Sequence, residues 1–204
     1  MTATTLVVLG LAVVVVLGAS GSGAPASADG AGTLNSAGYY GAMAPSGLPL
    51  LDFHLRDQDG VPADLDQYRG RVVILTFMYS TCQDTCPVEA QQIRGALDDL
   101  GQHVPTLAVS VDPANDTPNN AKSFMFKASL TGRMRFLLGT RAQLAPVWRE
   151  YGIQPQNVKS KVSDHSAYVL LLDRSGRQRV AFPDSELTPE ALAHDIRKLE
   201  GEPA

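Results

Sequence analysis

Cysteine is scarce in this chain, with only Cys82 and Cys86 among 204 residues. Two cysteines exclude a multiply crosslinked scaffold and a four-cysteine zinc site. Runs of basic residues are also missing, and the formal net charge is −4. Because nucleic acid is bound through basic surfaces, we expect no nucleic-acid partner.

Charged side chains are absent from residues 1–28, and residues 6–19 form an apolar run. The small residues that follow, ending in Ala-Ser-Ala at 26–28, are typical of a signal-peptide cleavage site. The segment is also about long enough to cross a bilayer as a helix. We expect a signal peptide or an N-terminal membrane anchor over 1–28, although the first basic residue is Arg56. Either interpretation predicts an extracytoplasmic protein, attached to the membrane if the segment is retained and secreted if it is cleaved.

The rest of the chain divides by composition. Residues 29–47 are rich in Gly, Ala and Ser and show no periodic apolar pattern, so they are predicted to form a flexible linker. Residues 48–204 have the length of one ordinary domain. Such a domain buries about two thirds of its unfolded surface and needs no crosslink to fold.

The first half of this domain has a β-hairpin pattern followed by a β-α-β pattern. Residues 51–56 alternate apolar and polar before a turn at 57–60, and residues 72–79 form a near-continuous apolar strand. A helix with apolar positions at 90, 93, 97 and 100 follows, and residues 104–111 return as a buried strand. In open α/β sheets, ligands bind beyond the carboxyl ends of such strands. The pattern therefore predicts a site at the 79–85 connection.

The second half of the domain continues with alternating elements. Helices are predicted over 119–128 and 141–151, and a second hairpin is predicted from residues 167–172 and 178–182. A final helix is expected to begin at Thr188-Pro189, with threonine as the cap and proline in the first turn.

The two cysteines lie four residues apart at the predicted start of the first helix. Asp84 or Thr85 is expected to cap this helix, and Pro87 suits its first turn. A helix N-terminus favours thiolate over thiol, and side chains at i and i+4 share one face. The pair can thus bind one metal ion or form a disulfide. A purely structural disulfide is the weaker interpretation, because so short a loop contributes only about 2 kcal/mol.

One of the four histidines is a candidate ligand. His54, His103 and His194 occupy positions expected to face solvent, whereas His165 lies in a loop directly before the 167–172 strand. Two thiolates and an imidazole suit Cu(I), and they accept Cu(II) with an added oxygen ligand. Zinc remains possible, although a closed zinc site has four protein ligands.

Two aspartates follow the 104–111 strand. Asp112 ends that strand on the predicted side, where it either orients or weakly binds the metal, or simply forms a turn. For the segment Asp116-Thr117-Pro118 we favour a role at the start of the next helix, since Asp or Thr before Pro commonly begins one.

The chain resembles the Sco/SenC family of membrane-associated, thioredoxin-like copper proteins. The resemblance rests on three motifs, namely Cys82-x-x-x-Cys86-Pro87, Val111-Asp112-Pro113-x-x-Asp116-Thr117-Pro118 and Asp164-His165-Ser166. It implies an α/β, thioredoxin-like fold whose central mixed sheet is flanked by helices, with an added N-terminal β-hairpin. It also implies copper ligation by Cys82, Cys86 and His165, and matches Asp112 to an acidic position associated with the copper site.

The resemblance further implies a role at the binuclear copper centre in subunit II of cytochrome c oxidase. In one version the protein is a metallochaperone that receives copper from an upstream donor and delivers it. In the other it is a thiol-disulfide oxidoreductase whose redox-active pair, Cys82 and Cys86, reduces the oxidase subunit or another exported protein and is itself reduced by a thioredoxin-like partner. Gln83 replaces a proline common between the family's cysteines. A peroxiredoxin-like peroxidase is disfavoured, because no basic residue lies between Tyr79 and Gln92.

Overall fold

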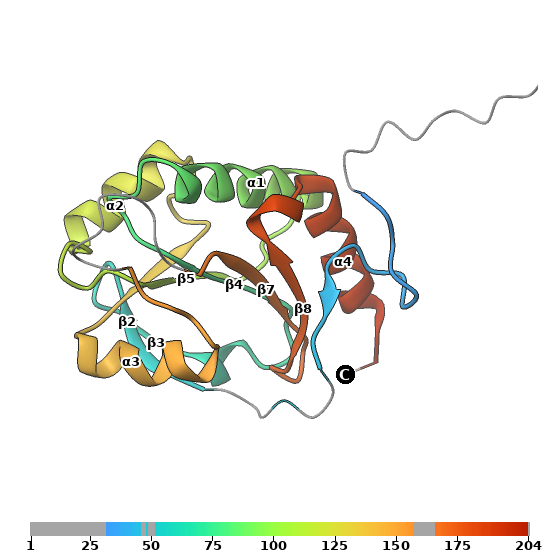
Figure 1. Ribbon diagram of the computed structural model, residues 1–204, viewed down its shortest axis with the longest axis horizontal. Helices are drawn as coiled ribbons and strands as arrows, with labels where there is room; N and C mark the ends of the chain where they lie inside the picture. The colour runs from blue at the N-terminus through green and yellow to red at the C-terminus, as the bar shows by residue number, and fades with distance from the viewer. Residues whose placement is uncertain (1–31, 46–47, 49–51, 157–165, 204) are drawn as a thin grey trace, which may run out of the picture.

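The computed structural model of the chain describes residues 32–45, 48, 52–156 and 166–203. These residues form one mixed sheet in the order β1-β8-β7-β4-β5-β6-β2-β3, with helices on both of its faces (Figure 1). The strands are β1 Ala42–Met43, β2 His54–Asp57, β3 Pro62–Asp64, β4 Val73–Met78, β5 Thr106–Ser110, β6 Arg135–Leu138, β7 Tyr168–Leu172 and β8 Gln178–Pro183. The helices are α1 Thr85–Leu100, α2 Pro118–Lys127, α3 Arg141–Glu150 and α4 Pro189–Gly201, with short 3-10 turns η1 Leu65–Tyr68 and η2 Asp184–Glu186.

The centre of the sheet is the predicted β-α-β unit. All six residues of β4 are buried, as are all five of β5, and the two strands are parallel. β6 continues the parallel arrangement beside β5, whereas β7 runs antiparallel to β4. The carboxyl ends of β4 and β5 therefore meet at one edge of the sheet, where the 79–85 connection begins. The expected central mixed sheet flanked by helices is confirmed.

The four helices begin close to the predicted positions. Asp84 caps α1 by accepting the Thr85 N–H at 2.7 Å, and threonines at 117, 140 and 188 cap α2, α3 and α4. α1 and α4 lie side by side on one face of the sheet, and α3 covers the other (Figure 1). Gly95 permits that approach, since a Cβ there would lie 2.9 Å from Pro189 of α4.

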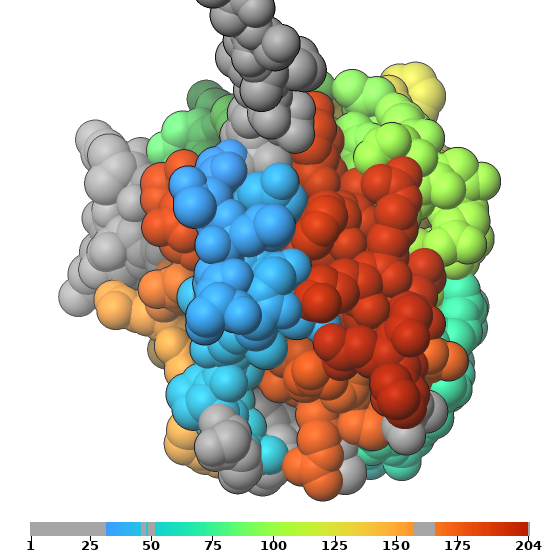
Figure 2. Space-filling view, turned by 90° about the vertical axis from the view of Figure 1, so that its right-hand side faces the viewer, coloured from blue at the N-terminus to red at the C-terminus, as the bar shows by residue number. Residues whose placement is uncertain are grey.

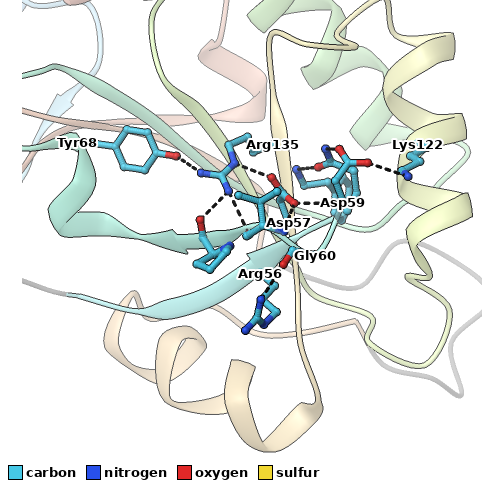
Figure 3. A network of polar contacts seen from close by, with 11 residues as sticks. Arg56, Asp57, Asp59, Gly60, Tyr68, Lys122 and Arg135 are labelled. Atoms are coloured by element: carbon cyan, nitrogen blue, oxygen red, sulfur yellow. Dashed lines mark hydrogen bonds and ion pairs between the residues drawn. The ribbon is translucent and has the colours of Figure 1, made fainter.

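The predicted N-terminal β-hairpin is confirmed as β2 and β3, which extend the sheet next to β6. Arg135 of β6 fastens it, because its guanidinium donates to Asp57 at 2.8 Å, to the Tyr68 hydroxyl at 2.6 Å and to two backbone carbonyls of the hairpin (Figure 3). A second ion pair joins Asp59 to Lys122 of α2 at 2.8 Å. β6 itself was not predicted from the sequence, since four residues are too few to show a clear period.

Residues 32–45 correct one prediction. They were expected to belong to a flexible linker, but they form an ordered strap along α4 and β8 (Figure 2). Tyr39 within this strap is only 1% exposed, and its hydroxyl donates to Glu202. β1 adds an edge strand antiparallel to β8. The linker prediction is wrong here because a buried aromatic ring and strand pairing with β8 hold a segment whose composition is otherwise small and polar.

A buried carboxylate holds the backbone of this strap. Asp195 of α4 is fully buried and accepts the N–H groups of Tyr40 and Gly41 at 2.9 to 3.1 Å. Gly41 is required because a Cβ there would lie 2.4 Å from the Val180 side chain.

Within the described ranges, no helix is long and apolar enough to cross a membrane. The predicted signal peptide or anchor over 1–28 lies outside the described residues.

Candidate functional site

The two cysteines come together at the start of α1, as predicted. Both are present as thiols, with Cys86 in the first turn of the helix and Cys82 in the loop before it. The Cys86 N–H donates to the Cys82 sulfur at 3.4 Å, and the Cys82 thiol lies 3.0 Å from Asp84 Oδ1. The local helix start therefore places both sulfurs at the sheet edge where β4 and β5 end.

The two sulfurs are not equivalent. Cys82 is 6% exposed and Cys86 is 0% exposed. A hydrogen bond with Cys82 raises the pKa of the Cys86 thiol, burial and the charge of Cys82 raise it further, and the backbone of Tyr79 acts in the opposite direction. Burial and the neighbouring Cys82 therefore act on Cys86 against the preference for thiolate that a helix N-terminus provides. Cys82 is the sulfur that an incoming group reaches first.

Asp112 follows β5 at the same edge, where the turn role considered for it is confirmed and the role toward a metal stays a prediction. Its backbone carbonyl accepts the N–H groups of Asn115 and Asp116, which makes it a turn residue. Its Oδ2 accepts from the Asn115 side chain at 2.7 Å. Its Oδ1, however, is buried and has no hydrogen-bond partner among the described residues. A buried oxygen in that state is available to a ligand or to a group that binds one.

The predicted helix start at 116–118 is confirmed, and Asp116 itself has a further role. Thr117, not Asp116, caps α2. The buried Asp116 carboxylate accepts the Ser80 N–H at 2.7 Å, the Ser80 hydroxyl at 2.6 Å and the Ser110 hydroxyl at 2.5 Å. It thus ties the loop that carries Cys82 to the end of β5, and burial raises its pKa. Sequence reasoning missed this contact because it joins residues 36 positions apart.

α3 supports the same strand end. Trp148, predicted to be a packing residue, is 3% exposed and donates its ring N–H to the Ser110 carbonyl at 2.9 Å. Both faces of the sheet therefore contribute to the position of the site.

His165 lies outside the described residues, so its assignment as a ligand stays a prediction. The described residues on either side of that stretch pair with each other, since the Ser166 N–H donates to the Gln154 carbonyl at 3.1 Å. The Gln156 N–H donates at 3.1 Å to the carbonyl of Val111, which precedes Asp112. The chain therefore leaves and re-enters the described structure near the carboxyl end of β5.

The other three histidines remain at the surface, as expected. His54 lies 2.9 Å from Asp64, whose hydrogen bond raises its pKa. His103 contacts Arg71, and His194 contacts Asp195 while its side chain stays 41% exposed. In the part of the chain that the structure describes, no group of three or more His, Cys, Asp or Glu residues is arranged to hold a metal.

The chain matches known proteins over its folded part. Residues 48–200 match the family described as SCO1/SenC. The chain is 31% identical over 150 residues to the mitochondrial protein SCO2 of Saccharomyces cerevisiae, which is 68% of this chain and 47% of that protein. It thus spans about half the length of this relative.

Solved structures resemble it over most of their length. ScoI of Bradyrhizobium japonicum with copper bound is 30% identical, with a TM-score of 0.65 over 73% of this chain and 98% of that one. BsSco, described as containing a disulfide switch and as a member of the Sco family of cytochrome c oxidase assembly proteins, is 21% identical, with a TM-score of 0.67 over 78% and 97%. These matches confirm the predicted thioredoxin-like fold.

Proposed function

Because the chain belongs to the SCO1/SenC family, we propose that it is a copper chaperone for assembly of the binuclear copper centre in subunit II of cytochrome c oxidase. It works outside the cytoplasm and is held at the membrane by residues 1–28. Cys82, Cys86 and His165 bind the copper. The observation that carries this proposal is the contact between the two thiols at the start of α1, in a chain 30% identical to a ScoI protein that has copper bound.

The different burial of the two sulfurs sets the order in which they exchange copper. Cys82 is the more exposed sulfur and exchanges first with the donor or the recipient, while the buried Cys86 completes the site from behind. Cys86 must lose its proton to bind a metal, and its pKa is raised, so copper affinity increases with pH. The unpartnered Oδ1 of Asp112 is available to orient a ligand. In this proposal copper is the cargo that the protein carries.

The same geometry favours a second candidate, a thiol-disulfide oxidoreductase that acts on the oxidase subunit or another exported protein. Cys82 attacks a disulfide of the target, which forms a mixed disulfide and releases one target thiolate. Cys86 then attacks the Cys82 sulfur, which releases the second target thiolate and leaves Cys82 and Cys86 joined. A thioredoxin-like reductant restores the dithiol. Cys82 is slightly less buried than Cys86 and lines a groove that Cys86 does not reach, which supports this order.

Copper titration of the reduced protein tests the first candidate. Residues 29–204 are the suitable fragment, because the strap at 32–45 packs on the domain. We expect one-to-one binding that Cys82→Ala, Cys86→Ala and His165→Ala each weaken by at least about 100-fold in competition with a chelator. X-ray absorption should show sulfur ligation. His54→Ala is the matched control, since His54 is exposed and contacts only nearby aspartates.

Two results would contradict the assignment. If His165→Ala binds copper as tightly as the parent, the third ligand is wrong. If the parent binds weakly and no variant changes the affinity, the copper function is wrong, and the reduction potential of the cysteine pair becomes the measurement that tests the oxidoreductase.

A further inference from the structure

A groove of about 370 Å³ opens between the beginning of α1 and α2. Cys82 lines it, whereas Cys86 does not. Pro87 and the buried Phe124 give it an apolar floor. The more exposed sulfur of the site therefore faces a defined surface formed by two helices.

Neutral polar side chains occupy the walls of this groove. Gln83 and Gln91 line the α1 side, and Ser123 lines the α2 side. All three are exposed, and none has a hydrogen bond with another side chain or backbone group in the described ranges. Amides and hydroxyls that are not otherwise engaged can donate to and accept from the peptide groups of an extended chain.

Among the described residues that line the groove, Lys127, the last residue of α2, is the only charged one. It has no ion pair with any described residue, whereas Lys122 on the same helix is paired with Asp59 at 2.8 Å. The groove thus has a sulfur at one place, a single unpaired cation at another, and neutral polar groups and an apolar floor between them. An anion next to Lys127 would complement the only charge present.

We propose that this groove docks an extended, cysteine-bearing segment of the partner protein, with the partner's sulfur at Cys82 and an acidic side chain of the same segment at Lys127. The inference rests on the proposed function, because it names the kind of segment that exchanges copper or electrons with this site. A small acidic thiol would satisfy the sulfur and the cation, but it would leave the amides of Gln83 and Gln91 and the apolar floor without contacts.

Short synthetic peptides test the docking without copper. Each peptide carries one cysteine as a mixed disulfide with 2-nitro-5-thiobenzoate, together with either Glu or Lys at matched positions. The Cys82 thiolate attacks the peptide sulfur, the new bond joins Cys82 to the peptide, and thiobenzoate leaves as a coloured thiolate with the electron pair of the broken bond. The rate of colour release measures this first step.

We expect the reduced parent to react about threefold to fivefold faster with the Glu peptide than with the Lys peptide at low salt, as for one exposed charge pair. Lys127→Glu should reverse the preference, and 1 M salt should abolish it. Lys122→Glu makes the same charge change on the same helix outside the groove, and it should keep the parent's preference.

An unchanged preference in Lys127→Glu would overturn the proposal. Glutathione carrying the same leaving group is a second test. If it reacts as fast as the Glu peptide and depends equally on Lys127, the groove is a small-thiol site and the proposal is overturned. The assay uses neither copper nor His165. If the parent binds copper but shows no preference between the Glu and Lys peptides, only the docking is refuted. Loss of copper binding with an intact charge preference refutes only the chaperone.

Discussion

Replacing Asp116 with alanine tests whether the loop that carries Cys82 is held in place from β5. The carboxylate accepts three hydrogen bonds, two from Ser80 and one from the fully buried Ser110. Removing it leaves the Ser80 N–H and the Ser110 hydroxyl as orphaned donors at a cost of about 1 to 3 kcal/mol each. Part of this cost is offset because a desolvated carboxylate, whose pKa is raised by burial, is also removed. The free energy of unfolding should fall by about 2 to 3 kcal/mol.

Urea denaturation of the reduced protein measures this change. Asp116→Asn keeps one acceptor oxygen and should cost only about 1 kcal/mol. Asp98→Ala is the matched control, because that exposed aspartate pairs with arginines at the surface and its removal should leave the urea midpoint nearly unchanged. Under the proposed function, Asp116→Ala should also weaken copper binding by about tenfold or more, as loss of an outer supporting contact does. If Asp116→Ala unfolds at the same urea concentration as the parent and binds copper equally well, the reasoning is refuted.

Three further changes test the surrounding fold by denaturation. Glu202→Gln removes the carboxylate that accepts the Tyr39 hydroxyl, a bond that lowers the pKa of Glu202. The substitution should therefore lower the free energy of unfolding by about 1 kcal/mol at any pH above 4.5, the ordinary pKa of glutamate. The difference from the parent should shrink as the pH falls through the lower pKa that Glu202 has in the folded protein. A difference that does not change with pH would contradict this sign. Gly41→Val should cost about 2 to 3 kcal/mol by overpacking against β8 and should expose the strap to proteolysis. Gly60→Val strains the β2-β3 turn, where φ is +78°, but it lies at the opposite edge of the sheet from β1 and should leave the strap protected. Arg135→Met should cost about 2 to 3 kcal/mol because the buried Asp57 loses its partner, and an unchanged midpoint would show that the hairpin does not depend on it.

Local patterns predicted most of the fold. The apolar runs at 72–79 and 104–111 identified the parallel pair β4 and β5, since strands buried on both faces read as continuous apolar segments. Thr188 and Pro189 located the start of α4, because capping depends on neighbours within one turn. The cysteine pair was found in the same way, from its close spacing and its place between the end of a strand and the start of a helix.

Contacts between distant residues could not be predicted. The segment Asp116-Thr117-Pro118 does begin α2, but its sequence pattern gave no sign that Asp116 binds Ser80 in the loop after β4 and Ser110 at the end of β5. The strap at 32–45 was taken for a linker because Tyr39 is a single ring in a Gly-rich and Ser-rich segment, and only α4 and β8 provide the surface that buries it.

The sequence by itself determined the α/β class, the positions of the four helices, and the place of the two sulfurs at a strand-to-helix connection, since all of these follow from periods, caps and spacings within a few residues. Tertiary structure put Cys82 in the loop before α1 rather than on the predicted shared helix face, and it decided that Cys86 is the more deeply buried of the two. Burial and charge at Cys82 and Cys86 are set by everything packed around them. It also decided that Lys127 of α2 lies beside the same groove as Cys82, because only the packing of two helices on one sheet brings those residues together.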